Sequence, residues 1–206
     1  MTNYQDKLQD LQEIRQMMAR STRFLSLSGL AGISTGLIAL AGAVAAWWRL
    51  GAQWDYLNAP ARYEGMDLLT FFLIDAALVV VLAAGSALYF SWRKAQKQVL
   101  PFWNAAARNL LSSLLIPLVA GGLFCVIQVA SGSYRWVAAT MLLFYGMALL
   151  NASKYTLKEI GYLGITQIVL GIFCAWFSYY GLYFWAVGFG LMHILYGIVM
   201  YLTYER

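Results

Sequence analysis

Six long runs of apolar residues, separated by short polar segments, account for most of the chain. A helix that crosses about 30 Å of hydrocarbon needs about 20 consecutive apolar residues, so each run predicts a transmembrane helix. We expect the spans at about residues 25–48, 68–90, 109–130, 136–150, 160–179 and 182–203. The fourth span is short, and it is expected either to tilt little or to continue past Asn151. The pattern therefore predicts an all-α polytopic membrane protein in which residues 25–206 form one six-span bundle.

The composition agrees with this fold class. Of the 206 residues, 62% are hydrophobic and only 11% are charged, whereas about 25% are charged in a typical soluble domain. The first apolar run is too long for the core of a signal peptide and follows a polar arm, so we expect it to be retained as a span.

Residues 1–24 are expected to form a separate cytoplasmic helix. Apolar residues recur there at helical spacing among charged ones, which predicts an amphipathic helix. They are Tyr4, Leu8, Leu11, Ile14 and Met18. Such a helix either lies on the membrane surface as a lead-in to the first span or binds a partner.

The second and third hairpins are predicted to be an internal repeat. Seven residues recur 49 positions apart: Ile116/Ile165, Gly122/Gly171, Phe124/Phe173, Cys125/Cys174, Gly132/Gly181, Tyr134/Tyr183 and Trp136/Trp185. After a slip of two residues the match resumes at Met141/Met192, Tyr145/Tyr196 and Gly146/Gly197. Because a two-span unit keeps its membrane orientation, the copies should be related by an axis along the membrane normal. The first hairpin is a candidate for a diverged third copy, although no residue match shows it.

Positive charges fall unevenly on the two sides of this map. Eleven of the fourteen Lys and Arg residues lie in the N-terminal arm, the second and fourth connections and the C-terminal tail; the other three are Arg49, Arg62 and Arg135. Cytoplasmic segments carry such an excess, so we expect both termini in the cytoplasm. A plasma membrane, and for so compact a chain a bacterial inner membrane, is the expected location. The net charge of +5 is then explained without a nucleic acid, and the lipid bilayer is the expected partner.

A carboxylate and an imidazole lie inside the predicted spans. Such groups are costly in hydrocarbon unless they are paired or wet, which makes Asp75 and His193 functional candidates. At 1.5 Å per residue, Asp75 lies about 11 Å and His193 about 16 Å from the external end of its span. The two side chains could therefore meet if spans two and six are neighbours.

The repeat adds a third polar residue to this group. His193 stands where the first copy has Leu142, and Gln167 stands where it has Leu118. We predict an intramembrane polar pocket between hairpins, lined by Asp75, His193 and Gln167, in which the imidazole could respond near neutral pH. The alternative is that each group only satisfies local packing, with Asp75 bonded to a Tyr or Arg side chain and His193 to a carbonyl of a facing helix.

Two further features concern helix shape and packing. Pro117 should bend the third span and free a backbone carbonyl, whereas the repeat has Thr166 at the matching position. Small residues of the first span fall on one helical face, which predicts close helix contact. They are Gly29, Gly32, Gly36, Ala39, Ala43 and Ala46. That face packs either against the same chain or against a second copy or membrane partner.

A weak candidate for a cation site lies in the first external connection, at Asp55, Glu64 and Asp67. Three carboxylates without a recognised ligand spacing carry little specificity. Glu64 and Asp67 would equally suit the positive N-terminal end of the second span. We therefore expect no resident metal, and we expect no cofactor.

The sequence leaves three classes of function open. The first is transport or binding of a small solute or ion, with or without linkage to protons, through the polar pocket. The second is a non-catalytic sensor, assembly or regulatory subunit that acts through helix packing and the N-terminal helix. A membrane enzyme is the least favoured, because the chain has a single His and lacks HExxH, paired CxxC and phosphate-loop motifs.

Overall fold

The computed structural model describes residues 23–50, 65–98 and 102–206, with side chains from Leu68 onward in the second of these ranges. Within these ranges it contains six helices that are long and apolar enough to cross a membrane, which confirms the predicted number of spans. Residues 1–22 of the predicted N-terminal helix lie outside the described residues. So do Asp55 and Glu64, and the side chain of Asp67.

The described helices follow the predicted spans closely. They are α2 (Gly29–Leu50), α3 (Gly65–Lys97), α4 (Ala105–Ala130), α5 (Val137–Ala152), α6 (Lys158–Trp176), α7 (Gly181–Trp185) and α8 (His193–Tyr204), with a π-helical segment, η5 (Ala186–Met192), between α7 and α8. Short 3-10 turns, η2 (Tyr134–Trp136), η3 (Ser153–Tyr155) and η4 (Ser178–Tyr180), lie at helix ends. The fourth span does continue past Asn151, and the sixth span consists of α7, η5 and α8 in succession.

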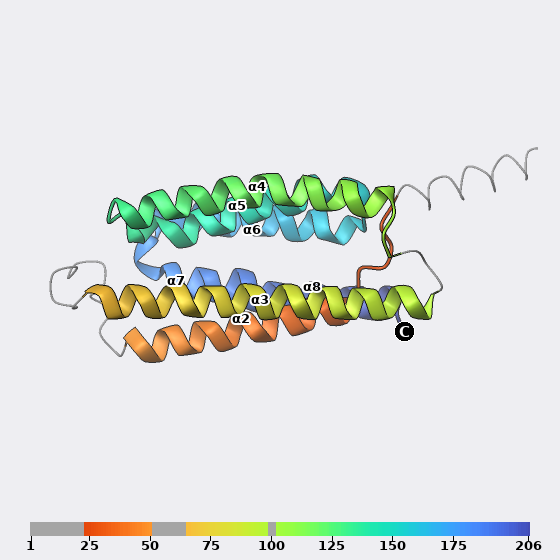
Figure 1. Cartoon of the computed structure of the whole chain (residues 1–206), viewed down its shortest axis with the longest axis horizontal. Coiled ribbons are helices and arrows are strands. Elements are labelled where there is room, and N and C mark those ends of the chain that lie inside the picture. Colours follow the sequence, from red (N-terminus) through yellow and green to blue (C-terminus); the bar gives the residue numbers. More distant parts are fainter. Residues whose placement is uncertain (1–22, 51–64, 99–101) are drawn as a thin grey trace, which may run out of the picture.

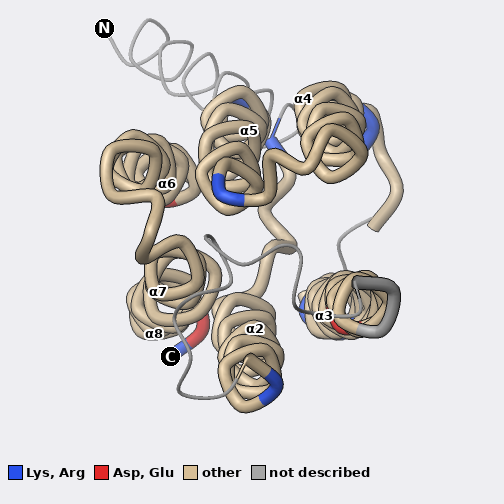
Figure 2. The backbone as a smooth tube through the Cα atoms, turned by 90° about the vertical axis from the view of Figure 1, so that its left-hand side faces the viewer, with Lys and Arg blue, Asp and Glu red and all other residues tan. Residues whose placement is uncertain are grey.

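The helices run side by side in two layers. Figure 1 shows α4, α5 and α6 in one layer and α2, α3 and the α7–α8 span in the other. Seen from the end, the helices follow one another around a ring in the order α5, α6, α7–α8, α2, α3 and α4 (Figure 2). Residue contacts join α5 to α6, α8 to α2, α2 to α3 and α4 to α5.

The first span begins at Gly29 rather than at residue 25, because polar side chains cap the N-terminus of the helix at this point. The Ser28 hydroxyl oxygen accepts a hydrogen bond from the Leu30 N–H at 3.2 Å, as a helix N-cap does. The Glu205 carboxylate accepts the Gly29 N–H at 2.6 Å. These contacts satisfy two of the amide groups that a helix leaves free at its N-terminus.

Two pairs of helices cross at glycines in the same way. A Cβ atom built on Gly146 of α5 would lie 2.7 Å from the Gly164 carbonyl oxygen of α6, and one built on Gly164 would lie 2.8 Å from the Gly146 carbonyl oxygen. In the second pair, a Cβ on Gly197 of α8 would lie 2.7 Å from the Gly29 carbonyl oxygen of α2, and the reverse distance is 2.5 Å. Only residues without a side chain allow backbones to approach this closely.

The small-residue face of the first span therefore packs at its glycine end against the same chain. Gly29, Gly32 and Gly36 all lie against the backbone of the α7–α8 span. Ala39, Ala43 and Ala46 continue the face and are buried. This intramolecular contact is one of the two alternatives that the sequence left open.

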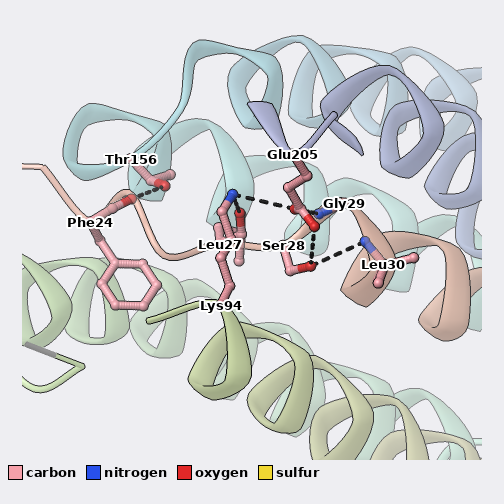
Figure 3. A network of polar contacts seen from close by, with 8 residues as sticks. All are labelled: Phe24, Leu27, Ser28, Gly29, Leu30, Lys94, Thr156 and Glu205. Atoms are coloured by element: carbon pink, nitrogen blue, oxygen red, sulfur yellow. Dashed lines mark hydrogen bonds and ion pairs between the residues drawn. The ribbon is translucent and has the colours of Figure 1, made fainter. Parts of the chain in front are cut away.

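The two layers are tied together at the end of the bundle that carries Lys94, Lys97, Lys154 and Lys158, which we call the basic end. Ahead of α2, the Phe24 N–H donates to the Tyr155 carbonyl at 2.7 Å. The Thr156 hydroxyl in turn donates to the Phe24 carbonyl at 2.7 Å (Figure 3). The segment Arg23–Ser28 thus links the start of α2 to the turn between α5 and α6.

Candidate functional site: a buried histidine at a π-helical segment

His193 is the first residue of α8 and directly follows the π-helical segment η5. This segment falls where the repeat slips by two residues: four residues separate Trp136 from Met141, whereas six separate Trp185 from Met192. A helix accommodates inserted residues by widening its turns locally, and such π-helical turns are frequent at functional sites. The π-helical geometry before His193 therefore coincides with the two-residue slip in the predicted repeat.

Both ring nitrogens of His193 have partners. Nδ1 lies 3.0 Å from the Gly188 carbonyl oxygen, and Nε2 lies 2.7 Å from the Tyr145 hydroxyl of α5. Because a carbonyl oxygen can only accept, Nδ1 carries a proton. In the neutral imidazole, Nε2 is then the acceptor and the Tyr145 hydroxyl is the donor. This fixes the tautomer that the hydrogen bonds require.

Gln167 of α6 bonds to the same carbonyl. Its Nε2 donates to the Gly188 oxygen at 2.7 Å, so this oxygen accepts two side-chain hydrogen bonds. The amide oxygen of Gln167 is buried and has no hydrogen-bond partner. Gly188 also has no room for a side chain, since a Cβ there would lie 2.6 Å from that oxygen.

Apolar and aromatic side chains enclose the cluster. Gln167 is 0% and His193 5% exposed. The rings of Tyr145 and Phe189 stack on the imidazole, with centroids 5.4 and 6.1 Å from it. Leu142, the repeat counterpart of His193, is itself completely buried nearby in contact range of Gly188. The described structure therefore buries these polar groups among apolar and aromatic side chains.

The predicted pocket is brought together only in part. Gln167 and His193 meet at Gly188, whereas Asp75 of α3 lies against Gly42 of α2, with both carboxylate oxygens 3.5 Å from a Cβ built there. Within the described part of the chain Asp75 has no hydrogen bond or ion pair. Gly42 is ten residues from Gly32, which lies against the His193 carbonyl, so the two sites are about 15 Å apart along α2.

A second polar cluster at the basic end was not anticipated from the sequence. Lys94 of α3 pairs with Glu205 at 3.3 Å and donates to the Leu27 carbonyl at 2.8 Å. Glu205 also accepts from the Ser28 hydroxyl at 3.1 Å (Figure 3). Both charged side chains are largely buried, at 8% and 13% exposure. Their positions near span ends made them resemble ordinary solvated charges, and no spacing in the sequence relates residues so far apart.

The carbonyl that Pro117 frees has a partner. Pro117 has no N–H to offer to the carbonyl four residues earlier, that of Ser113. The Asn151 side chain of α5 donates to this oxygen at 3.1 Å. Helix α4 continues through Pro117, and Asn151 supplies the hydrogen bond that the proline cannot.

No group of three or more metal-ligating side chains lies together among the described residues. The cluster at Gly188 contains an imidazole, a phenol and a carboxamide, which can hold or pass a proton and bind a small polar group. Two further side-chain hydrogen bonds join neighbouring helices elsewhere: a buried one from Gln128 to Thr140 at 2.9 Å, and a part-buried one from Tyr204 to Glu159 at 2.9 Å.

Comparisons with known proteins add no relative: no protein-family model matches the chain, and neither the curated proteins nor the solved structures contain a significant match.

Proposed function

We propose that this chain is a non-catalytic membrane protein that binds or transports a small polar solute or ion, with His193 as the group that takes up or releases a proton. The observation that carries the proposal is the unpaired, buried Gln167 oxygen beside a carbonyl that two side chains already share. Polar groups at this depth are expensive, and an unpaired one is a place for a ligand that can donate a hydrogen bond.

The π-helical segment supplies the means of access. If η5 became regular α-helix through a register shift of one residue, the adjoining helix would rotate about its own axis by about 100°. His193 would then leave Tyr145 and Gly188 together, because both contacts depend on this register. Among the described residues, Tyr145 is the one titratable side chain that bonds to His193, and no charged side chain does so.

The proposed working group consists of Gln167, Tyr145 and His193, while Asp75 stands apart from it. The orientation with both termini in the cytoplasm, the bacterial inner membrane and the duplicated hairpins remain parts of the proposal. The charge distribution supports the first of these, and the equivalent glycine crossings of α5–α6 and α8–α2 support the last.

The single His of the chain permits a direct test. The protein would be labelled with ¹⁵N-histidine, purified without a histidine tag and placed in lipid bilayers, and its imidazole signals followed from pH 4 to 9 by solid-state NMR. We expect a neutral, Nδ1-protonated ring that becomes doubly protonated within this range. In proteoliposomes that contain a pH-sensitive dye, an imposed potential should drive proton movement that His193→Leu abolishes. A ring that never titrates, together with unchanged proton movement in His193→Leu, would contradict the proposal.

A second candidate function is a sensor or assembly subunit, and the exposure of α3 favours it. The residues of α3 between Leu68 and Phe90 include none that is fully buried, and apolar side chains project from most of its circumference. Counting bleaching steps of single fluorophore-labelled molecules in native membrane discs would test this role. A constant number of copies above one supports it, and single steps throughout would count against a homo-oligomer.

A further inference from the structure

The two glycine crossings share a residue pattern that reappears on a helix pair that does not cross. On the α5 side the contacting residues are Leu143, Gly146 and Leu150, and on the α8 side they are Ile194, Gly197 and Tyr201. In both, a large apolar residue precedes the glycine by three positions and another follows it by four. The same spacing occurs in α3 as Leu82, Gly85 and Tyr89.

The opposing helices share a second pattern. The α6 face has Gly164, Ile168 and Gly171, and the α2 face has Gly29, Ile33 and Gly36. In each crossing a large side chain lies over the later glycine: Leu143 over Gly171, and Ile194 over Gly36. The 49-residue repeat places the corresponding face of α4 at Leu115, Val119 and Gly122.

These two faces, on α3 and α4, are both uncovered. Leu82 is 55%, Tyr89 54%, Leu115 43% and Val119 57% exposed. A Cβ atom added to Gly85 or to Gly122 would meet nothing within 4 Å. Along the ring of helices, α3 and α4 are the successive pair that stands open (Figure 2).

We propose that α3 and α4 close on each other through a third crossing of the same kind, so that the open seam between them is a lateral gate to the lipid. In the closed arrangement Leu82 packs over Gly122, as Leu143 does over Gly171, and the Leu115 side chain fits against Gly85. In the open arrangement acyl chains of the bilayer cover both faces, because no water is present at this depth.

The levels of the two faces along the bundle support this pairing. Gly85 lies nine residues, about 14 Å, from Lys94 at the basic end, and Leu115 lies eight residues, about 12 Å, from Ala107 at the same end. Leu82 and Gly122 lie about 18 and 22 Å from these references. The residues proposed to meet therefore start at similar depths, and α3 needs to tilt rather than slide.

The segment Arg23–Ser28 holds the two helices apart at the basic end. On one side Lys94 of α3 donates to the Leu27 carbonyl at 2.8 Å. On the other, Phe24 packs with Ala106 and Ala107 of α4 and lies edge-on to the Phe102 ring, with centroids 6.0 Å apart. This wedge provides a fixed end about which the remainder of α3 can swing.

The same chain is the favoured source of both faces. Helices α3 and α4 are consecutive and their ends are joined by residues 98–104, much as α5 and α6 are joined by residues 153–157. A short connection keeps the two faces at high effective concentration. A pairing between α3 of one copy and α4 of another is the competing arrangement, and the experiment below separates the two.

Disulfide trapping in liposomes tests the gate. In a Cys125→Ala, Cys174→Ala background, the opposed pair Gly85→Cys with Leu115→Cys would be compared with Val81→Cys with Ile116→Cys, a pair of strongly exposed neighbouring positions. We expect the opposed pair to oxidise within one chain at least tenfold faster, giving a product of monomer size. Equal rates for both pairs, or a product of dimer size, would overturn closure within the chain.

Distance measurements provide a check that does not require cysteines at the contact. Spin labels at Val81→Cys and Ile116→Cys should report two separations in lipid, one for each arrangement. Gly122→Leu fills the notch that receives Leu82 and should remove the shorter separation, whereas Ala120→Leu places the same side chain on another exposed face and should leave both. A single separation that Gly122→Leu does not alter would contradict the gate.

Discussion

The Tyr145 hydroxyl lies 2.7 Å from Nε2 of His193, and the opposite ring nitrogen lies 3.0 Å from the Gly188 carbonyl oxygen. The imidazole thus connects α5 to a carbonyl within the π-helical segment of its own span. Any movement of that segment must therefore either break these hydrogen bonds or move Tyr145 along with the segment.

The tautomer of His193 can be checked through its phenolic partner. Tyr145→Phe removes the hydrogen that Nε2 accepts, so we expect the ¹⁵N signal of Nε2 to move toward the value of an unbonded imidazole nitrogen while Nδ1 stays protonated. Tyr196→Phe is the matched control, since its hydroxyl is the repeat counterpart and lies near Thr166 at 3.3 Å rather than near His193. Solid-state NMR of the ¹⁵N-histidine protein measures both. Equal changes in the two variants would show that the Tyr145 contact does not set the ring state.

Gln167→Leu introduces the residue that the other copy has at this position. The variant loses one hydrogen bond but also removes a buried, unpaired oxygen, so the free energy of unfolding should change by less than about 1 kcal/mol. Gln167→Glu should cost about 2 kcal/mol or more, because a carboxylate would be placed in a dry site. Unfolding in detergent mixtures followed by circular dichroism measures this. Gln128→Leu is a control at another buried amide, and a large loss of stability in Gln167→Leu alone would be unexpected.

Asn151 and Pro117 should be energetically coupled. Asn151→Ala leaves the Ser113 carbonyl without a donor and should destabilise the protein by about 1 kcal/mol. Pro117→Ala restores an N–H that can serve the same carbonyl. In that background, Asn151→Ala should cost distinctly less, and a double-mutant cycle of unfolding free energies measures the difference. Strictly additive effects would mean that Asn151 does not substitute for the missing backbone bond.

Glu205 should contribute to stability although it is the penultimate residue. Glu205→Ala removes an ion pair with Lys94 and two hydrogen bonds at the start of α2, and it leaves Lys94 without its counter-charge. We expect a loss of about 1–3 kcal/mol. Glu205→Gln keeps an acceptor and should lose less, and Arg206→Ala, an exposed neighbour, should change little. If Arg206→Ala lowered the free energy of unfolding as much as Glu205→Ala does, this role of Glu205 would be contradicted.

The number of spans and their approximate ends follow from the sequence alone. Hydrocarbon thickness sets the length of a span, so apolar runs determine where the helices are. The predicted repeat singles out Gln167 and His193 because each stands opposite a leucine in the alignment of the two segments, and both side chains bond to the Gly188 carbonyl. Pro117 likewise predicted a freed carbonyl, while its partner Asn151 depended on how α4 packs on α5.

Tertiary packing decided which polar residues lie in contact, and the periodicity of the sequence does not contain this information. Asp75 and His193 have similar depths in their spans, but depth does not determine which way a side chain points around its helix. Asp75 lies against Gly42 of α2, whereas the His193 backbone lies against Gly32. The pairing of Lys94 with Glu205 joins residues 111 positions apart through the ring closure of α8 on α2. The length and hydrophobicity of a span are properties of a single helix. The glycine crossings that determine which helices pack together depend on the surfaces of two helices. That is why the sequence determined the spans and the tertiary structure decided which of their polar residues meet.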